Sequence, residues 1–193
     1  MQAATIIMPE LSEQNDEEVA IQVQKGDIES FRILVERYEP KMTRYAKRFF
    51  FDGDEGKDLV QEIFIKAYVN IKSFDVSRRF SPWIYRIAHN EFVNNIKKRQ
   101  KERNNVSVFD FDVLFPHLVA KETADDGFNK AEVKGMLDHS LSKLSEKYKE
   151  PLVLYYFEDM DYREIADILH IPISTVGVRL QRGRAMLKKI VKG

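Results

Sequence analysis

The apolar residues of this chain recur three and four positions apart, and this spacing limits what the chain can fold into. Leu34, Tyr38, Met42 and Tyr45 follow it in the N-terminal half, and residues 162–169 repeat it. Residues three and four apart share one face of an α-helix, whereas a half-buried strand needs strict alternation. Alternation is seen only briefly, in "VSVFDFDVLF". The sequence therefore predicts an all-α fold.

The same spacing predicts a series of helices separated by turns. Pro40 lies inside the second helix and is expected to kink or break it, because proline removes a backbone donor. Pro82 suits the first turn of the fourth helix. The expected helices cover residues 16–25, 28–50, 57–73, 82–103, 132–144, 146–157 and 162–169, and a last one follows Ser174.

The formal net charge is zero, but the charges are segregated along the chain. Residues 77–103 hold eight Lys or Arg against two acidic residues, and residues 179–193 hold six and no acid. Between them, residues 104–127 carry five carboxylates against one lysine and show no helical period. Two basic regions separated by an acidic one indicate nucleic-acid binding. The net charge of zero conceals this segregation.

The acidic stretch is expected to be a flexible linker between two small helical domains, because it mixes Phe with Asp and contains Pro116. We expect a disordered N-terminal tail over residues 1–15 and a first domain over 16–103. The linker then covers 104–127, and the second domain covers 128–193.

The second domain contains the pattern of a helix-turn-helix. Residues 162–169 carry an apolar stripe, and Asp161 with Glu164 matches the capping-box pattern at the start of this helix. A tight break at "HIP" follows, and Ser174 is expected to cap the next helix. The second helix of such a motif enters the major groove of DNA. A helical hairpin with a solvated basic face is the alternative.

The helix after Ser174 is expected to pack by one face and to bind DNA by the other. Val176, Leu180 and Leu187 form the inner stripe, and Gly183 is placed to allow close helix packing. Arginine can reach guanine edges or phosphates, and hydroxyl groups at a helix start suit phosphate contacts. The expected outward residues are Thr175, Arg179 and Arg182.

The helix expected from Pro82 offers a second nucleic-acid surface. Arg86, Asn90, Asn94 and Lys97 share one of its faces. Asparagine is a mediocre helix former, so two of them stacked among basic residues suggest hydrogen bonding to base edges. The rings of Trp83 and Phe80, at the start of this helix, could stack on unpaired bases. The alternative is that Trp83 belongs to the core and that the asparagines are simply solvated.

Several function classes are disfavoured by the sequence. Without cysteine, the chain has no disulfide, thiolate metal site or thiol nucleophile. The four histidines lack metal-ligand spacing, and "FDGDEG" fails the calcium-loop pattern, so no metal and no cofactor is expected. No nucleophile motif or phosphate-binding loop is seen, so we expect no catalytic residue. No signal peptide or membrane span is evident, which favours a cytoplasmic protein.

Two long motifs resemble bacterial RNA polymerase sigma factors. "DLVQEIFIKAYVNIKSFD" and "RRFSPWIYRIAHNEFVNNIKKR" are similar to sigma domain two. "LSEKYKEPLVLYYFEDMDYREIADILHIPISTVGVRLQRGRAML" is similar to sigma domain four. With these two domains and a short linker, the chain resembles the extracytoplasmic-function (ECF) subfamily.

The resemblance implies a transcription initiation factor that binds core RNA polymerase, through the β′ clamp helices and the β flap, and promoter DNA. An anti-sigma factor is a further implied partner. The implied polymerase-binding residues are Asp58, Gln61, Glu62 and Ile65. The implied minus-ten residues are Arg79, Trp83, Arg86, Asn90, Asn94, Lys97 and Lys98, beside a loop over 74–81. The implied minus-thirty-five residues are Ser174, Thr175, Val178, Arg179, Gln181, Arg182 and Arg184.

Some features depart from the family pattern or leave alternatives open. Relatives often have Lys or Arg where this chain has Gly177, so minus-thirty-five specificity does not carry over. Val178 is alternatively a packing residue. Asp110, Asp112, Asp125 and Asp126 give the linker the charge of a nucleic-acid mimic, although a solvated tether explains them equally. A stand-alone helix-turn-helix repressor or activator is the other candidate function, but it gives the first motif no role.

Overall fold

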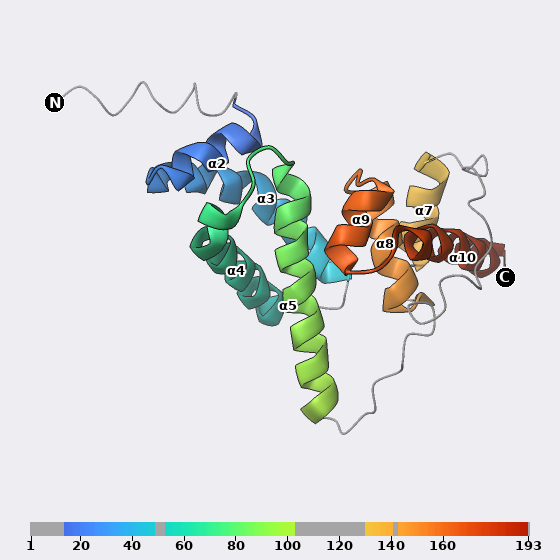
Figure 1. Cartoon of the computed structure of the whole chain (residues 1–193). Helices are drawn as coiled ribbons and strands as arrows, with labels where there is room; N and C mark the ends of the chain where they lie inside the picture. The colour runs from blue at the N-terminus through green and yellow to red at the C-terminus, as the bar shows by residue number, and fades with distance from the viewer. Residues whose placement is uncertain (1–13, 49–52, 103–129, 141–142, 193) are drawn as a thin grey trace. The chain divides into compact units, whose positions relative to one another are not determined.

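The computed structural model describes residues 14–48, 53–102, 130–140 and 143–192. Within these ranges the chain forms eight α-helices and one short 3₁₀ helix, with no strand (Figure 1). The predicted all-α fold is confirmed. No helix in this described part is long and apolar enough to cross a membrane.

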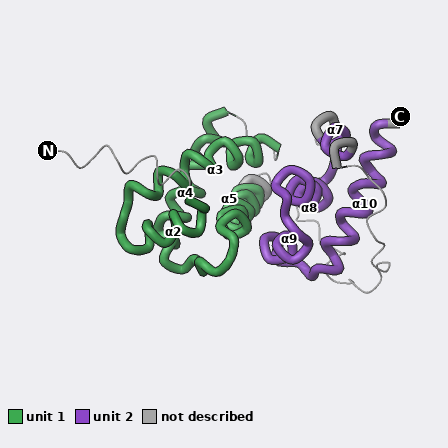
Figure 2. The backbone as a smooth tube through the Cα atoms, turned by 90° about the horizontal axis from the view of Figure 1, so that it is seen from above, with its two compact units in different colours: residues 1–98 green, residues 99–193 purple. Residues whose placement is uncertain are grey.

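The chain divides into two compact units, residues 1–98 and 99–193, shown in different colours in Figure 2. The expected linker and most of the expected tail lie outside the described residues.

The first unit is built from four α-helices and a 3₁₀ turn. Its core comes from α3 and α4, which pack on one another, and from α2, which packs on α3 and on the turn (Figure 1). The elements are α2 (Asp16–Gln24), α3 (Ile28–Arg48), α4 (Gly53–Asn70), η1 (Ile71–Ser73) and α5 (Phe80–Glu102).

The helix boundaries of this unit follow local chemistry, with two corrections to the sequence expectation. Helix α3 runs unbroken through Pro40, which is exposed, so a break at this residue is wrong. Helix α4 begins at Gly53, four residues before the expected start at residue 57. Gly53 has a φ of 66°, a conformation that glycine adopts without strain and that sequence periodicity does not reveal.

Aromatic side chains fill the space between α3 and α5. The Tyr38 and Phe80 rings meet edge to face with centroids 5.3 Å apart, and Tyr45 packs on Tyr85 at 5.0 Å and on Phe92 at 5.1 Å. All five residues are at most 2% exposed. Such pairs stabilise a core beyond their buried area, so they fix α5 firmly on α3.

The second unit contains α7 (Lys130–Ser140), α8 (Glu146–Tyr156), α9 (Tyr162–Leu169) and α10 (Ile173–Lys192). Helix α10 packs against each of the other three, and α8 also packs on α7 and α9. The predicted inner stripe of α10 is confirmed, since Val176, Leu180 and Leu187 are at most 1% exposed.

Helices α9 and α10 form the predicted helix-turn-helix. The capping box at Asp161 is confirmed: the Asp161 carboxylate accepts from the Glu164 N–H at 2.8 Å, and the Glu164 carboxylate accepts from the Asp161 N–H at 2.8 Å. His170 ends α9 with a φ of 54°. The Ser174 cap is wrong, because the Pro172 carbonyl already accepts from the Thr175 and Val176 N–H groups and α10 begins at Ile173.

Gly183 brings α10 close to α8, as the sequence predicts. A Cβ atom at this position would lie 2.7 Å from Leu152 Cδ1 and 3.2 Å from its Cγ, and Leu152 is completely buried. Gly177, in the same helix, is different: a Cβ there would meet only Tyr162 Cε2, at an ordinary 3.6 Å.

This difference predicts opposite effects of two alanine substitutions. Each gains roughly 1 kcal/mol of helix propensity, but Gly183→Ala also overpacks the core at a typical cost of about 1–3 kcal/mol. We therefore expect Gly183→Ala to unfold at lower denaturant than Gly177→Ala by this amount, measured by urea titration. Equal midpoints would mean that Leu152 moves aside without cost.

Candidate polymerase and nucleic-acid interfaces

One face of α4 is available to a partner. Asp58, Gln61, Glu62 and Ile65, the residues implied for polymerase binding, are all exposed. They lie off the buried stripe of this helix, so none is needed to fill the core. The expected geometry of this row is therefore confirmed, and it combines acidic, amide and apolar groups.

The row continues into two apolar residues that sequence reasoning missed. Tyr68 is 39% exposed and Val69 is 72% exposed, next to Ile65 at 57%. They follow Ile65 by three and four positions, so the helical period would have identified them. Exposed apolar side chains gathered on one face are typical of interaction surfaces. We call Asp58, Gln61, Glu62, Ile65, Tyr68 and Val69 the α4 face.

A charge network joins α4 to α5. Lys66 Nζ lies 2.7 Å from the Glu91 carboxylate, whose side chain is only 9% exposed, and 3.6 Å from that of Glu62. The hydrogen bond to Glu91 raises the pKa of Lys66. A nearly buried carboxylate needs such a partner, so Lys66 orients α5 relative to α4.

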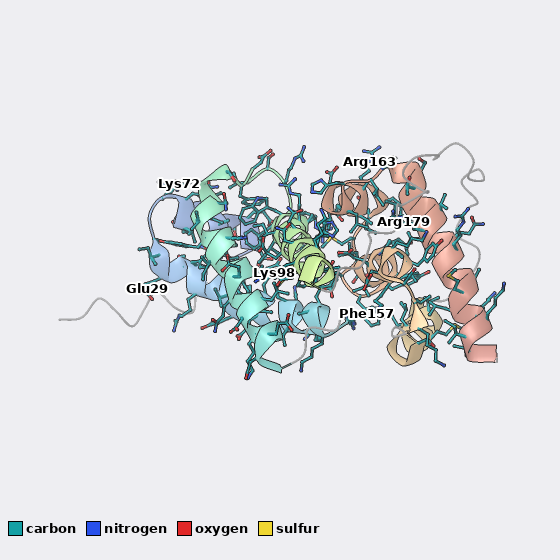
Figure 3. All side chains as sticks on the ribbon, turned by 90° about the horizontal axis from the view of Figure 1, so that it is seen from below. Glu29, Lys72, Lys98, Phe157, Arg163 and Arg179 are labelled. Carbon is teal, nitrogen blue, oxygen red and sulfur yellow. The ribbon has the colours of Figure 1, made fainter. Side chains whose placement is uncertain are left out.

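The exposed face of α5 carries the polar row that the sequence predicts. Asn90, Asn94, Lys97 and Lys98 are exposed, and Arg86 is half-buried at one end. Lys98 is labelled in Figure 3. The opposite side of α5 is packed against α3, so this row has no place in the core. Amide and cationic groups at helical spacing can contact base edges and phosphates together.

Trp83 does not belong to this exposed row. Its ring packs against Phe74 at 5.2 Å and Phe80 at 5.4 Å, and the residue is only 9% exposed. Phe80, the other ring predicted to stack on bases, is completely buried. The prediction of exposed rings is therefore wrong and the alternative of a core residue holds, while the role of Trp83 at DNA stays a prediction. The position three residues after Phe80 places Trp83 on the buried side of α5.

The segment between η1 and α5 forms an exposed loop with internal order. The Asp75 carboxylate accepts from the Ser77 N–H at 3.0 Å and from its hydroxyl at 2.7 Å. These bonds, from Ser77, lower the pKa of Asp75. Arg78 and Arg79 follow and are both exposed. We call residues 75–79 the reading loop, because the resemblance assigns base capture to this region.

The implied DNA-binding residues of α10 differ in exposure, and only some of them lie on the surface. Ser174 and Arg182 are exposed, and Gln181 is half-buried. The remaining four are buried: Thr175 is 1%, Val178 5%, Arg179 6% and Arg184 4% exposed. Figure 3 labels Arg179 on this helix. The expectation that Thr175 and Arg179 face outward with Arg182 is therefore wrong, although the roles of all seven residues at DNA stay predictions.

Helical geometry explains the burial of the two arginines. Arg179 lies three residues after Val176 and four before Gly183, so it flanks the packed stripe. Arg184 lies four residues after Leu180 and points toward α8, where its Nη1 atom is 3.4 Å from the Tyr156 hydroxyl oxygen. Apolar residues alone define too narrow an inner face, which is why Arg179 was expected to face outward; Arg184 was only implied as a DNA contact by the resemblance.

Thr175 and Val178 are the two buried residues of this set that carry no charge. Val178 fits the alternative of a packing residue. The Thr175 hydroxyl has no hydrogen-bond partner within the described part of the chain. Among the three implied arginines of α10, Arg182 is exposed, whereas Arg179 and Arg184 are buried.

The described residues hold no cluster of three or more His, Asp or Glu side chains that could bind a metal ion. The sequence of both units matches known families. Residues 34–102 match the family model for sigma-70 region 2, and residues 134–187 match that for sigma-70 region 4. The chain is 36% identical over 172 residues to the ECF RNA polymerase sigma factor SigW of Bacillus subtilis, covering 87% of this chain and 92% of the relative.

The chain belongs to the ECF sigma factors. It is also 30% identical to the ECF sigma-E factor of Escherichia coli, covering 94% of this chain and 97% of that one. In fold it is similar to the sigma factor RpoE of Bartonella quintana, solved in complex with the anti-sigma factor NepR. The TM-score is 0.62 at 24% identity, covering 86% of this chain and 98% of that one.

This sigma factor directs RNA polymerase to promoters and is a transcription initiation factor, not an enzyme. The sequence prediction of its family is confirmed. Core polymerase and promoter DNA are its partners. The alternative of a stand-alone repressor or activator leaves region 2 without a role.

The structure predicts different effects for two arginines of α10 that are two positions apart. Arg182→Ala should weaken binding to minus-thirty-five duplex DNA and lower the melting temperature less than Arg184→Ala does, because the Arg182 side chain is exposed. Arg184→Ala should lower stability by about 1–3 kcal/mol, since it removes a buried charged donor. Thermal melting and DNA titration of both variants measure this, and equal melting temperatures would contradict it.

Proposed function

We propose that this sigma factor divides promoter recognition among three surfaces. The α4 face binds the β′ clamp helices of core polymerase. The reading loop and the exposed row of α5 take up bases of the minus-ten element after the strands separate. Helix α10 binds the minus-thirty-five element in the major groove, while its unit contacts the β flap.

The observation that carries this proposal is the exposed pair Asn90 and Asn94 on a helix that is otherwise well packed. Both amides are solvent-facing, one turn apart, and flanked by Lys97 and Lys98. They contribute nothing to the core, and asparagine costs helix propensity. An amide offers a donor and an acceptor together, which suits the edge of an unpaired base.

The energetics favour capture after melting. Flipping a base out of the stack costs a few kcal/mol, which a preformed site offsets. Arg78, Arg79 and the lysines of α5 supply attraction to phosphates on either side. Cations alone would bind any strand, so the amides provide base preference and the cations provide affinity.

Two further assignments follow from the family. The solved relative from Bartonella quintana is bound to an anti-sigma factor, and we infer that a protein of this kind also binds the present chain. We also place its action in the cytoplasm, where core polymerase and promoters meet. Co-purification of the chain with core polymerase from a cytoplasmic fraction tests the second assignment.

Polymerase binding through the α4 face is tested by charge reversal. Asp58→Lys should weaken association with core polymerase roughly tenfold or more, because like charges at an interface cost several kcal/mol. Glu62 is left intact because it lies 3.6 Å from Lys66. Glu39→Lys, the same change at an exposed residue of α3, is the matched control. If both variants bind core polymerase like the wild type, the α4 face is not the contact.

Base capture by Asn90 is tested by strand opening. Asn90→Ala should leave core binding and the closed complex nearly unchanged, because the α4 face and α10 carry those contacts. Open-complex formation should fall sharply, since the cost of unstacking is no longer offset. A pre-melted bubble should restore part of the loss. Permanganate reactivity of minus-ten thymines on duplex and bubble templates measures both.

Asn95→Ala is the matched control for this experiment. Asn95 lies on the same helix, but its amide donates to the Glu91 carbonyl oxygen at 3.1 Å. We expect the Asn95 variant to open duplex promoters normally. If the Asn90 variant does so as well, Asn90 is only a solvated helix residue and the proposed site is wrong.

A further inference from the structure

The reading loop is attached at both of its ends to α2, a helix to which no DNA or polymerase contact is assigned. Figure 1 shows the segment after η1 passing beside α2 before α5 begins, and α2 packs on η1. The attachments are hydrogen bonds between residues 47 to 63 positions apart in the sequence. Each one holds a backbone atom of the loop's flanks.

The first attachment is made by Gln24, the last residue of α2. Its side-chain amide donates to the Ile71 carbonyl oxygen at 2.7 Å and to the Phe74 carbonyl oxygen at 2.8 Å. One amide group thus bridges two carbonyls that lie three residues apart. Because both acceptors are backbone atoms, Gln24 fixes the direction in which the chain leaves η1.

The second attachment is made by Glu17, in the first turn of α2. Its carboxylate accepts from the Phe80 N–H at 2.7 Å. Phe80 is the first residue of α5, where a helix leaves its N–H groups without internal acceptors. Glu17 therefore caps α5 from another helix, and its charge also suits the positive end of the helix dipole.

Helix α2 is itself held rigidly. The Asp16 carboxylate accepts from the Tyr38 hydroxyl at 2.6 Å and from Arg37 at 2.7 Å, both on α3. Burial, with the bond to Asp16, raises the pKa of Tyr38, so its hydroxyl stays protonated and donates. Asn15 and Glu18 form a capping box at the start of α2. Because α2 is fixed on α3, its residues Glu17 and Gln24 hold the flanks of the loop in a fixed position.

Between its two attached ends, the reading loop is exposed over residues 75–79. Its flanks are closed by Phe74 and Phe80, whose rings meet at 5.3 Å and which are both buried. The reading loop is thus exposed in its middle and anchored at both flanks. Its shape depends on where Gln24 and Glu17 hold those ends.

We propose that Glu17 and Gln24 are positioning residues for minus-ten recognition, because their hydrogen bonds hold both ends of the reading loop in the shape that accepts an unpaired base. This inference rests on the proposed function of the loop and α5. It adds α2 to the specificity machinery without direct DNA contact. Loosening either end lets the loop accept other bases, so selectivity falls while cationic attraction to the strand remains.

The test measures selectivity in the assembled holoenzyme. The probes are single-stranded DNA with the minus-ten sequence of a promoter that the wild type uses, and versions with one base changed. Selectivity is the dissociation constant for a base-changed probe divided by that for the native probe. Gln24→Leu should reduce this ratio roughly tenfold, since two hydrogen bonds are lost. Gln22→Leu is the matched control, because the Gln22 side chain makes no hydrogen bond in the described part of the chain.

A second pair of variants covers the case in which Gln24→Leu fails to fold. Glu17→Ala should lower the same ratio about threefold, and Glu17→Gln should retain it, because an amide oxygen still accepts from the Phe80 N–H. Hydrogen exchange at Phe80 in the full chain should become faster in the alanine variant and remain slow in the glutamine variant.

The outcomes separate this proposal from the proposed function. If Gln24→Leu or Glu17→Ala weakens all probes equally, or behaves like its control, the positioning role is overturned. A variant that melts at a lower temperature but keeps the wild-type ratio of dissociation constants also overturns the positioning role. If Asn90→Ala keeps wild-type selectivity, the Asn90 site fails, while a reduced ratio in the α2 variants still supports the positioning role of α2.

Discussion

The packing of Phe80 is the interaction on which the first unit depends. Its ring lies against Tyr38, Phe74 and Trp83 with centroids 5.3 to 5.4 Å away, and the residue is fully buried. It is also the first residue of α5, and its N–H is bound by Glu17. One residue therefore joins α2, α3, the reading loop and the start of α5. The direction of α5, and so of its exposed row, follows from this point.

This arrangement lets the same helices fold and function without conflict. On α4 the buried residues face α3 while the α4 face is left to solvent. On α5 the aromatic side packs on α3 while Asn90 and Asn94 remain outside. Lys66 and Glu91 link the two helices at 2.7 Å. A partner that binds the α4 face at Glu62 thus meets a charge network that reaches the helix bearing the amides.

The sequence predicted what depends on local pattern and missed what depends on distant backbone atoms. Helical periodicity identified the helices, and the Asp161 capping box and the close packing at Gly183 were correct. Arg179 was expected to face outward but is only 6% exposed, because it flanks the packed stripe of α10. The bonds made by Glu17 and Gln24 join a side chain to a backbone atom. Such bonds place little requirement on the residue type that supplies the backbone atom, so they leave no pattern to find.

The two glycines of α10 differ in whether helix packing requires them. Gly183 is required, since a Cβ there would lie 2.7 Å from Leu152. Gly177 is not required by packing, since a Cβ would meet Tyr162 at 3.6 Å and α10 is helical there. Glycine in a helix interior nevertheless costs roughly 1 kcal/mol relative to alanine. The fold gains nothing in return, so the reason for Gly177 lies outside the core. A surface without a side chain lets another backbone approach closely, which fits a helix proposed to enter the major groove.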